Sequence, residues 1–189
     1  MHIEYEARAL EIDKEEIEKK LVSLGAKKIA DFDYKRRVYD VIPKTEGKWI
    51  RLRTDGNKTT LAVKQINKET IDGTEETEVE VSDFEETNKI LNSLGFFEKG
   101  YQENKRTRYV LNGIELDIDT WPYIPTYLEI EGKDSKDVEK MIELLEIDKS
   151  KVTTLGVLAI FEQVYKIDAG KIPVSKFDIP LDDKYKIRD

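Results

Sequence analysis

Charged side chains recur at every second position along several short segments of the sequence. The first such segment carries Glu4, Glu6 and Arg8, with apolar or aromatic residues between them. Because side chains at positions i and i+2 of a β-strand point to the same face, each segment predicts a strand with one charged and one apolar face. The same alternation joins Arg51 with Arg53, Ala62 with Lys64, Glu76 with Glu78 and Glu80, Arg106 with Arg108, Asp117 with Asp119, and Glu129 with Glu131. Carboxylates bind hard metal ions and guanidinium groups bind phosphate, so these rows could together hold a metal-bound anion.

Turn residues and apolar spacing predict the elements that position these rows. Residues 48–54 and 59–66 flank Asp55-Gly56-Asn57-Lys58, and residues 106–111 and 114–118 flank Asn112-Gly113, so both pairs are expected to form β-hairpins. Strands over 3–10, 28–41, 74–81 and 126–130 bring the total to about eight. One helix is expected from Asp13 to Gly25, a second over about 83–94 and a third from near Ser135, with a short last helix within 155–165. The apolar stripes of the three helices predict packing on a sheet.

The sequence also contains an internal repeat. A shift of 70 positions superposes Leu21, Ser23, Leu24, Gly25, Lys35, Arg36 and Tyr39 on Leu91, Ser93, Leu94, Gly95, Lys105, Arg106 and Tyr109 without a gap. Each of the three helices also follows a Glu-x-Glu strand end. The chain is therefore expected to consist of strand, helix and hairpin units folded into one body.

Composition excludes several classes of function. The 189 residues suffice for one domain, and 32 Lys and Arg against 40 Asp and Glu give a net charge of −8, which argues against a duplex nucleic-acid partner. The sequence has no cysteine and a single histidine, His2, so thiol chemistry, zinc clusters and histidine-based catalysis are not expected. No apolar run could span a membrane and no targeting segment is visible, so a cytoplasmic location with no membrane partner is expected.

The charged rows allow two interpretations. In the first, each row is the solvated face of an ordinary half-exposed strand. In the second, the strands close into a barrel with a charged lumen, and the helices cover its apolar outside. The second is favoured because seven strands repeat the design and because acidic and basic pairs lie on different strands. A lumen crowded with carboxylates needs cations, and oxygen-only ligands favour Mg²⁺ or Mn²⁺ over Ca²⁺. Together with the Arg and Lys rows, such an ion implies a polyphosphate ligand.

These residues resemble a known family. Glu4-Tyr5-Glu6-Ala7-Arg8 is similar to the Glu-x-Glu-x-Lys signature of the CYTH superfamily, the triphosphate tunnel metalloenzymes, which includes thiamine triphosphatases, tripolyphosphatases and one class of bacterial adenylyl cyclases. The likeness continues, in the family's order, through Arg51-Leu52-Arg53, Leu61-Ala62-Val63-Lys64, Glu76/Glu78/Glu80, Lys105 to Tyr109, Leu116 to Asp119 and Leu128 to Glu131. It covers roughly residues 1–165. The resemblance implies an α+β fold, an eight-stranded antiparallel β-barrel with helices packed on the outside, in a single domain over 1–189 with a C-terminal tail at about 166–189.

The resemblance also implies roles for individual residues. The expected metal ligands are Glu4, Glu6, Asp117, Asp119, Glu129 and Glu131. The expected triphosphate-binding residues are Arg51, Arg53, Lys64, Arg106 and Arg108, with Arg36 added because it matches Arg106 in the repeat. Arg8, Lys64, Glu78 and Glu80 are expected to contribute to catalysis, Glu78 and Glu80 by holding the basic residues or a second metal.

One position departs from the family pattern. Arg8 stands where the family usually has Lys, and because a guanidinium stays protonated it cannot act as a base, although it can orient phosphate. The resemblance implies hydrolysis of the terminal phosphoanhydride of tripolyphosphate or of an organic triphosphate such as ATP or thiamine triphosphate, with Mg²⁺ or Mn²⁺. The alternatives are an adenylyl cyclase that forms cyclic AMP and pyrophosphate, a non-catalytic polyphosphate- or nucleotide-binding module, and a charged β-protein without a site.

One histidine and two tryptophans are further candidates for a part in the site. His2 is interpreted as a solvated terminal residue. Trp49 is interpreted as packing at the barrel rim rather than as a platform for a base. The segment from Trp121 to Pro125 either caps a tunnel mouth or forms a rigid turn. An open sheet edge would also allow a homodimer.

Overall fold

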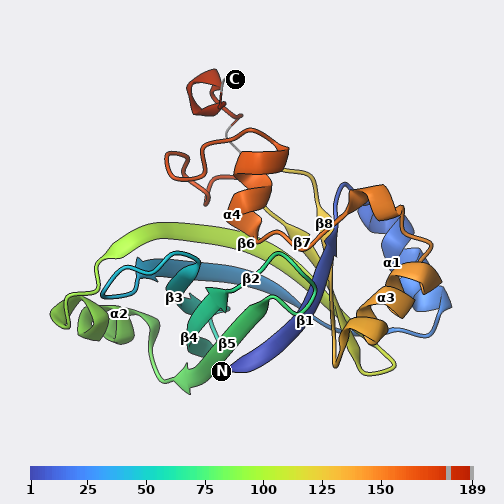
Figure 1. Cartoon of the computed structure of the whole chain (residues 1–189), viewed down its shortest axis with the longest axis horizontal. Coiled ribbons are helices and arrows are strands. Elements are labelled where there is room, and N and C mark those ends of the chain that lie inside the picture. Colours follow the sequence, from blue (N-terminus) through green and yellow to red (C-terminus); the bar gives the residue numbers. More distant parts are fainter. Residues whose placement is uncertain (178–179, 188–189) are drawn as a thin grey trace.

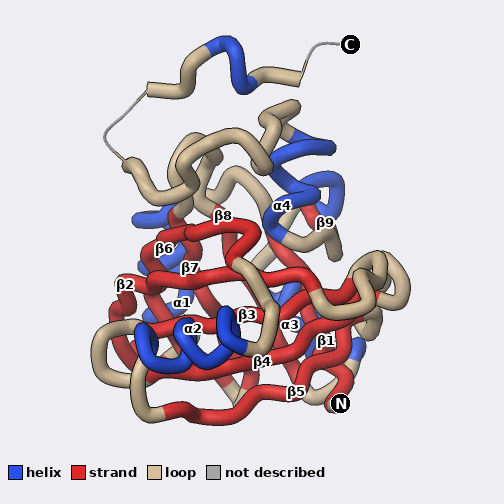
Figure 2. Tube along the Cα trace, turned by 90° about the vertical axis from the view of Figure 1, so that its left-hand side faces the viewer, coloured by secondary structure: helices blue, strands red, loops and turns tan. Residues whose placement is uncertain are grey.

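The computed structural model describes residues 1–177 and 180–187 of the chain. This part contains nine strands: β1 (His2–Ala9), β2 (Lys27–Asp40), β3 (Lys48–Thr54), β4 (Thr59–Ile66), β5 (Thr74–Val81), β6 (Glu98–Leu111), β7 (Ile114–Thr120), β8 (Tyr127–Gly132) and β9 (Val152–Thr153). They pair in the order β5-β4-β3-β2-β6-β7-β8-β1-β9. The start of β1 also pairs with β5, His2 with Glu76 and Glu4 with Thr74, and this closes the first eight strands into an antiparallel barrel (Figure 2). The predicted fold class is therefore confirmed.

The hairpin turns follow from their residue types. Asn112 and Gly113 both have positive φ, the geometry of a type I′ turn, and Gly56 has a φ of +91° in the β3–β4 turn. The strand predicted over 106–111 is too short, because β6 already begins at Glu98. Residues 98–105 lack apolar alternation, but they pair with β2 from Tyr39 to Asp33. In this long pair, two 14-residue strands related by the sequence repeat run beside each other.

The three predicted helices are confirmed: α1 (Lys14–Ser23), α2 (Phe84–Ser93) and α3 (Ser135–Leu144). Each begins after an aspartate, Asp13, Asp83 or Asp134, whose side chain accepts a hydrogen bond from a backbone N–H of the first turn. α1 and α2 are followed by Gly25 and Gly95, whose positive φ ends the helix without side-chain strain.

The helices cover the apolar outer face of the barrel. α1 and α3 lie side by side at one end in Figure 1, and α2 lies at the other. Ile17 of α1 and Val138 of α3 share one buried cluster with the outer face of β1, β7 and β8. Leu91 of α2 packs on Tyr39 and Leu52 of β2 and β3. The apolar positions of the strands therefore face the helices, and the charged positions are left for the interior.

The C-terminal segment packs on the barrel. A 3₁₀ turn at Lys149–Lys151 precedes this segment. α4 (Val157–Ala159) continues into a π-helical turn (Ile160–Val164), which agrees with the short last helix predicted within 155–165. A second 3₁₀ turn follows at Asp183–Tyr185. Phe161, Ile167, Ile172 and Val174 are buried in a cluster with Trp121. The described residues of the C-terminal tail therefore pack on the rest of the molecule, and residues 178–179 and 188–189 lie outside the described part. No described helix is long and apolar enough to cross a membrane.

Candidate functional site

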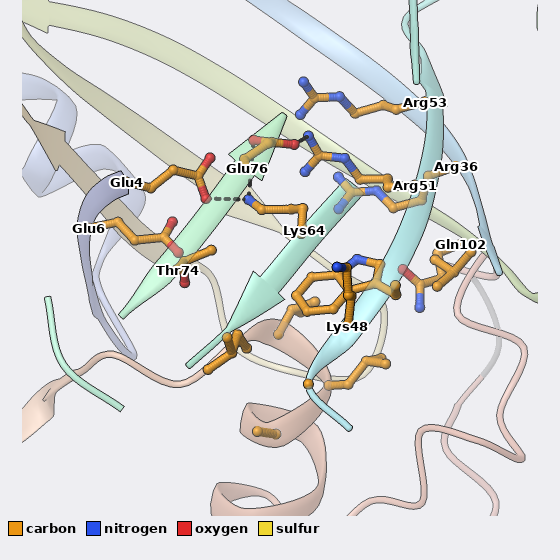
Figure 3. Close-up of a pocket in the computed structure, with 18 of the residues that line it drawn as sticks. Glu4, Glu6, Arg36, Lys48, Arg51, Arg53, Lys64, Thr74, Glu76 and Gln102 are labelled. Carbon is orange, nitrogen blue, oxygen red and sulfur yellow. Dashed lines mark hydrogen bonds and ion pairs between the residues drawn. The ribbon is translucent and has the colours of Figure 1, made fainter. Parts of the chain in front are cut away.

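A cavity of about 600 Å³ lies inside the barrel and is lined by charged side chains (Figure 3). All eight barrel strands, β1 to β8, contribute residues to its lining, and their types match the alternation in the sequence. Most of the predicted site residues line it: Glu4, Glu6, Arg8, Arg36, Arg51, Arg53, Lys64, Glu78, Arg106, Arg108, Glu129 and Glu131. The structure therefore brings together residues that are up to 127 positions apart, from Glu4 to Glu131.

One wall of the cavity is basic. Arg51 and Arg53 of β3 point into it, and Lys64 of β4 lies between them and Glu4 (Figure 3). Glu76 and Glu78 of β5 hold these cations: Arg51 Nη2 lies 2.7 Å from Glu76 and 2.9 Å from Glu78, and Arg53 Nη2 lies 3.3 Å from Glu78. Lys64 Nζ lies 2.7 Å from Glu4 and 3.4 Å from Glu76. Glu78 thus pairs with two of the basic residues, and its expected part in catalysis stays a prediction.

Arg36 of β2 completes the basic wall and has no carboxylate partner among the described residues. Its guanidinium donates one hydrogen bond, to Asn104 Oδ1, and its central carbon lies 4.6 Å from the ring centre of Trp121. Burial and the charges of Arg51, Arg53 and Arg106 lower the pKa of Arg36 to about 9. Burial and Arg51 likewise lower the pKa of Arg53 to about 10. Burial is the largest cause of both shifts, and the neighbouring guanidinium groups add to it because they repel one another.

The opposite wall, on β1 and β8, is acidic. Burial, followed by the nearby Glu129 and Glu6, raises the pKa of Glu131 to about 7. Burial, followed by a hydrogen bond with Glu76, raises the pKa of Glu4 to about 8 even though Lys64 opposes the shift. In contrast, the pKa of Glu129 is lowered, because Arg8 and Arg106 outweigh its burial. The acidic wall therefore combines two carboxylates, Glu4 and Glu131, whose charged form is disfavoured with one, Glu129, whose charge is stabilised by two arginines.

Arg8 lies within the acidic wall. Its Nη2 lies 2.9 Å from Glu6 and 2.7 Å from Glu129, and its Nη1 donates a 3.0 Å hydrogen bond to the backbone carbonyl of Leu155. These contacts tie the two carboxylate strands to the start of the C-terminal segment. Burial opposes the charge on Arg8, but the two carboxylates outweigh it and raise its pKa above the ordinary value. Arg8 is thus positioned as a fixed cation.

Arg106 and Arg108 of β6 differ from Arg36 because carboxylates neutralise them. Arg106 donates to Asp117, Asp119 and Glu129, and Arg108 donates to Asp117. Asp117 and Asp119 are 2% and 0% exposed and do not line the cavity. Whether they bind metal stays a prediction; in the structure their carboxylates face guanidinium groups and hold them in the barrel wall.

Glu80 also lies outside the cavity lining. It is at the end of β5, where its exposed carboxylate lies 3.1 Å from Lys58 Nζ. The alternation correctly places Glu80 on the same strand face as Glu78, but the strand leaves the barrel interior before it reaches Glu80. Its expected part in catalysis gains no support from this position.

Several residues of the site are not among the predicted ones. Glu76 carries the same alternation signal as Glu78, whereas Asn104, Gln102 and Tyr127 are uncharged and give no such signal. Gly156 to Ala159 line the cavity from the C-terminal segment, to which the sequence pattern assigns no chemistry. Trp49 and Trp121 both line the cavity, Trp121 donates its indole N–H to Tyr127, and His2 is exposed.

The donor set fits a divalent cation that shares its ligands with a bound anion. No group of three or more Asp, Glu or His side chains in the described residues forms a ready-made metal site. Glu131, however, has no ion-pair partner in this part of the chain, and its pKa is raised by burial and then by neighbouring carboxylates. Mg²⁺ typically uses one or two carboxylates and completes its shell with phosphate oxygens and water. Glu131 and its neighbours on the acidic wall match that pattern better than a closed protein cage.

The sequence matches the model of the CYTH domain over residues 2–155. The chain belongs to the CYTH domain family. The CYTH segment contains all eight barrel strands and every predicted site residue, while α4 and the tail follow it. No curated protein matches the sequence at a significant level.

Solved structures share the CYTH fold of this chain. A conserved protein from Pyrococcus furiosus matches with a TM-score of 0.72 and 23% identity over 82% of this chain and 98% of that one. A candidate adenylate cyclase from Vibrio parahaemolyticus matches with a TM-score of 0.72 and 12% identity over 85% and 98% of the two chains. A protein from Hippeastrum, described as a candidate adenylyl cyclase with a dominant triphosphatase activity, matches with a TM-score of 0.57 and 17% identity over 87% and 96%. At these identities the likeness shows the CYTH fold alone.

Proposed function

We propose that this CYTH protein is a divalent-metal-dependent hydrolase of the terminal phosphoanhydride of tripolyphosphate or an organic triphosphate. The observation that carries the proposal is Arg36, a buried guanidinium beside Arg51 and Arg53 that has no carboxylate partner within residues 1–177 and 180–187. A folded protein that keeps an uncompensated cation in its interior does so at a cost in stability. A bound polyanion would remove that cost, and guanidinium groups match phosphate oxygens in geometry.

The acidic wall supports the metal part of the proposal. Glu4, Glu6, Glu129 and Glu131 face the basic wall across a cavity of about 600 Å³, and two of them have raised pKa values. An anion bound to the basic wall would lie against these carboxylates, and a divalent cation would offset the repulsion between them. Such an ion, Mg²⁺ or Mn²⁺, would withdraw charge from phosphate oxygens and activate water.

The chain's own residues bind and orient the substrate. Arg36, Arg51 and Arg53 would neutralise the charge that develops on the phosphate oxygens in the transition state. Lys64 joins the two walls because it lies at the acidic Glu4 and at Glu76. Arg8 keeps its proton and is held by Glu6 and Glu129, so its part is to fix these carboxylates and contribute positive charge rather than to remove a proton from water.

Product analysis tests this proposal. The protein is incubated with tripolyphosphate and, separately, with ATP, each with Mg²⁺ or Mn²⁺, and orthophosphate, pyrophosphate and cyclic AMP are resolved. We expect orthophosphate and pyrophosphate from tripolyphosphate, and a large loss of activity in Arg36→Met. Arg37→Met is the matched control, because Arg37 is the next residue of β2 but pairs with Glu85 and Glu98 outside the cavity. Formation of cyclic AMP and pyrophosphate from ATP would show that the protein is a cyclase rather than a hydrolase. Binding of the ligand without any product would show that it is a non-catalytic binding module.

A further inference from the structure

Two arginines related by the internal repeat have opposite charge environments. Arg36 and Arg106 occupy equivalent positions of β2 and β6, and both are buried. Arg106 donates four hydrogen bonds, all of them to carboxylates. Arg36 donates a single side-chain hydrogen bond within the described residues, and the acceptor is the neutral amide of Asn104. At equivalent positions of the repeat, Arg106 is therefore neutralised by carboxylates of the barrel wall, whereas the charge of Arg36 remains available to a ligand.

Asn104 lies between these two environments. Its Oδ1 accepts from Arg36 Nη2, and its Nδ2 donates a 2.8 Å hydrogen bond to Asp119 Oδ1, the same oxygen that accepts from Arg106 Nε at 2.9 Å. The side chain is 1% exposed, so no solvent competes for either contact. In the repeat, Asn104 takes the position of Tyr34, which it also faces across the β2–β6 pair.

The neighbours fix the orientation of the Asn104 amide. A guanidinium only donates and a carboxylate only accepts, so the amide oxygen must face Arg36 and the amide nitrogen must face Asp119. A carboxylate at position 104 could neutralise Arg36, and an apolar side chain would leave its guanidinium unanchored. An amide anchors the guanidinium and leaves its charge for a ligand.

We propose that Asn104 is a positioning residue for the anion site, which holds the Arg36 guanidinium in the cavity through an amide anchored on Asp119. The proposal rests on the proposed function, because it assumes that the cavity binds a polyphosphate. Asn104 does not line the cavity and acts through Arg36. Removing its amide therefore weakens anion binding only while Arg36 is present.

The test is a double-mutant cycle read by isothermal titration calorimetry with tripolyphosphate, in EDTA and again in Mg²⁺. Asn104→Leu, which keeps the volume and removes both hydrogen bonds, is expected to weaken binding by about tenfold or more. In an Arg36→Met background the same change is expected to have less than about a twofold effect. Asn104→Ser, whose hydroxyl can both donate and accept, is expected to restore part of the affinity. Asn88→Leu of α2 is the control, because Asn88 accepts hydrogen bonds from Tyr39 and Asn92 outside the cavity.

The outcomes separate the inference from the proposed function. Wild-type protein that binds no tripolyphosphate in either condition overturns the proposed function. Wild-type binding that Asn104→Leu leaves unchanged overturns only the role of Asn104. An equal loss in Asn104→Leu with and without Arg36, or a loss that Asn88→Leu reproduces, also overturns it, because the effect would then be a general loss of structure. Should the Leu variant fail to fold, the Ser variant in both backgrounds gives the same comparison.

Discussion

Replacing Arg36 with methionine is expected to stabilise the ligand-free protein and to weaken its binding of tripolyphosphate. Methionine fills a volume similar to that of the arginine stem and carries no charge. Arg36 is buried, and the positive charges of Arg51, Arg53 and Arg106 oppose its own. The substitution therefore removes a cation whose burial is opposed by its neighbours.

The size of the effect follows from the pKa of Arg36, which falls from 12.5 to about 9. At 1.36 kcal/mol for each pH unit, the folded state destabilises the charged form by about 5 kcal/mol. Losing the hydrogen bond to Asn104 costs about 2 kcal/mol, and losing the contact with Trp121 costs about 1 kcal/mol. The net stabilisation is about 2 kcal/mol, which would raise the melting temperature by roughly 4–8 °C in a domain of this size.

Arg106→Met is the matched comparison, and its sign is expected to be opposite. Removing Arg106 leaves Asp117, Asp119 and Glu129 buried with less positive charge, which costs about 3–5 kcal/mol. Thermal melts of both variants in EDTA, together with tripolyphosphate titrations, measure the difference. The reasoning is refuted if Arg36→Met destabilises the protein as much as Arg106→Met does, or if it binds tripolyphosphate as tightly as the wild type.

Three further predictions concern protons and single residues. The melting temperature of the ligand-free protein is expected to fall by several degrees between pH 6 and pH 8. The pKa values of Glu131 and Glu4 are raised from 4.5 to about 7 and about 8, so the folded protein holds protons that the unfolded chain has already released. A melting temperature that stays constant or rises with pH in EDTA would contradict this. Arg8→Lys is expected to change kcat several-fold and KM by less than about twofold, since lysine can lose its proton and arginine cannot. An unaltered kcat in steady-state assays would show that the permanent charge of Arg8 does not affect turnover. Glu78→Gln is expected to lower kcat/KM by about tenfold, because Glu78 holds two arginines, whereas Glu80→Gln should cost less than about twofold; equal losses would show that the carboxylate outside the cavity matters as much as the one that lines it.

The sequence predicts most of this fold because the pattern it uses is periodic. Charges at every second position, with apolar residues between them, define the two faces of each strand, and a closed barrel is the arrangement that buries both faces. Hairpin turns such as Asn112-Gly113 and helix caps such as Asp13 are local signals and are found where they are expected. No local signal marks the start of β6 at Glu98, because this part of the strand is determined by its pairing with β2.

The site is predicted less completely, for a physical reason. Alternation shows which side chains face inward, but it does not show which partner neutralises each one. Arg36 and Arg106 match in the repeat, and only the tertiary structure shows that three carboxylates surround Arg106 while an amide meets Arg36. Asn104 and the C-terminal residues 156–159 are uncharged, so a search for charged rows does not find them. Glu80 has the right alternation but lies beyond the end of the cavity.

A crystal structure of the protein with Mn²⁺ and tripolyphosphate, with the metal located by its anomalous scattering, tests the central claim most directly. Our account predicts phosphate oxygens on Arg36, Arg51 and Arg53, and manganese between these oxygens and the acidic wall at Glu131 or Glu4. An empty cavity at saturating ligand, or phosphate and manganese bound only outside the barrel, would contradict it.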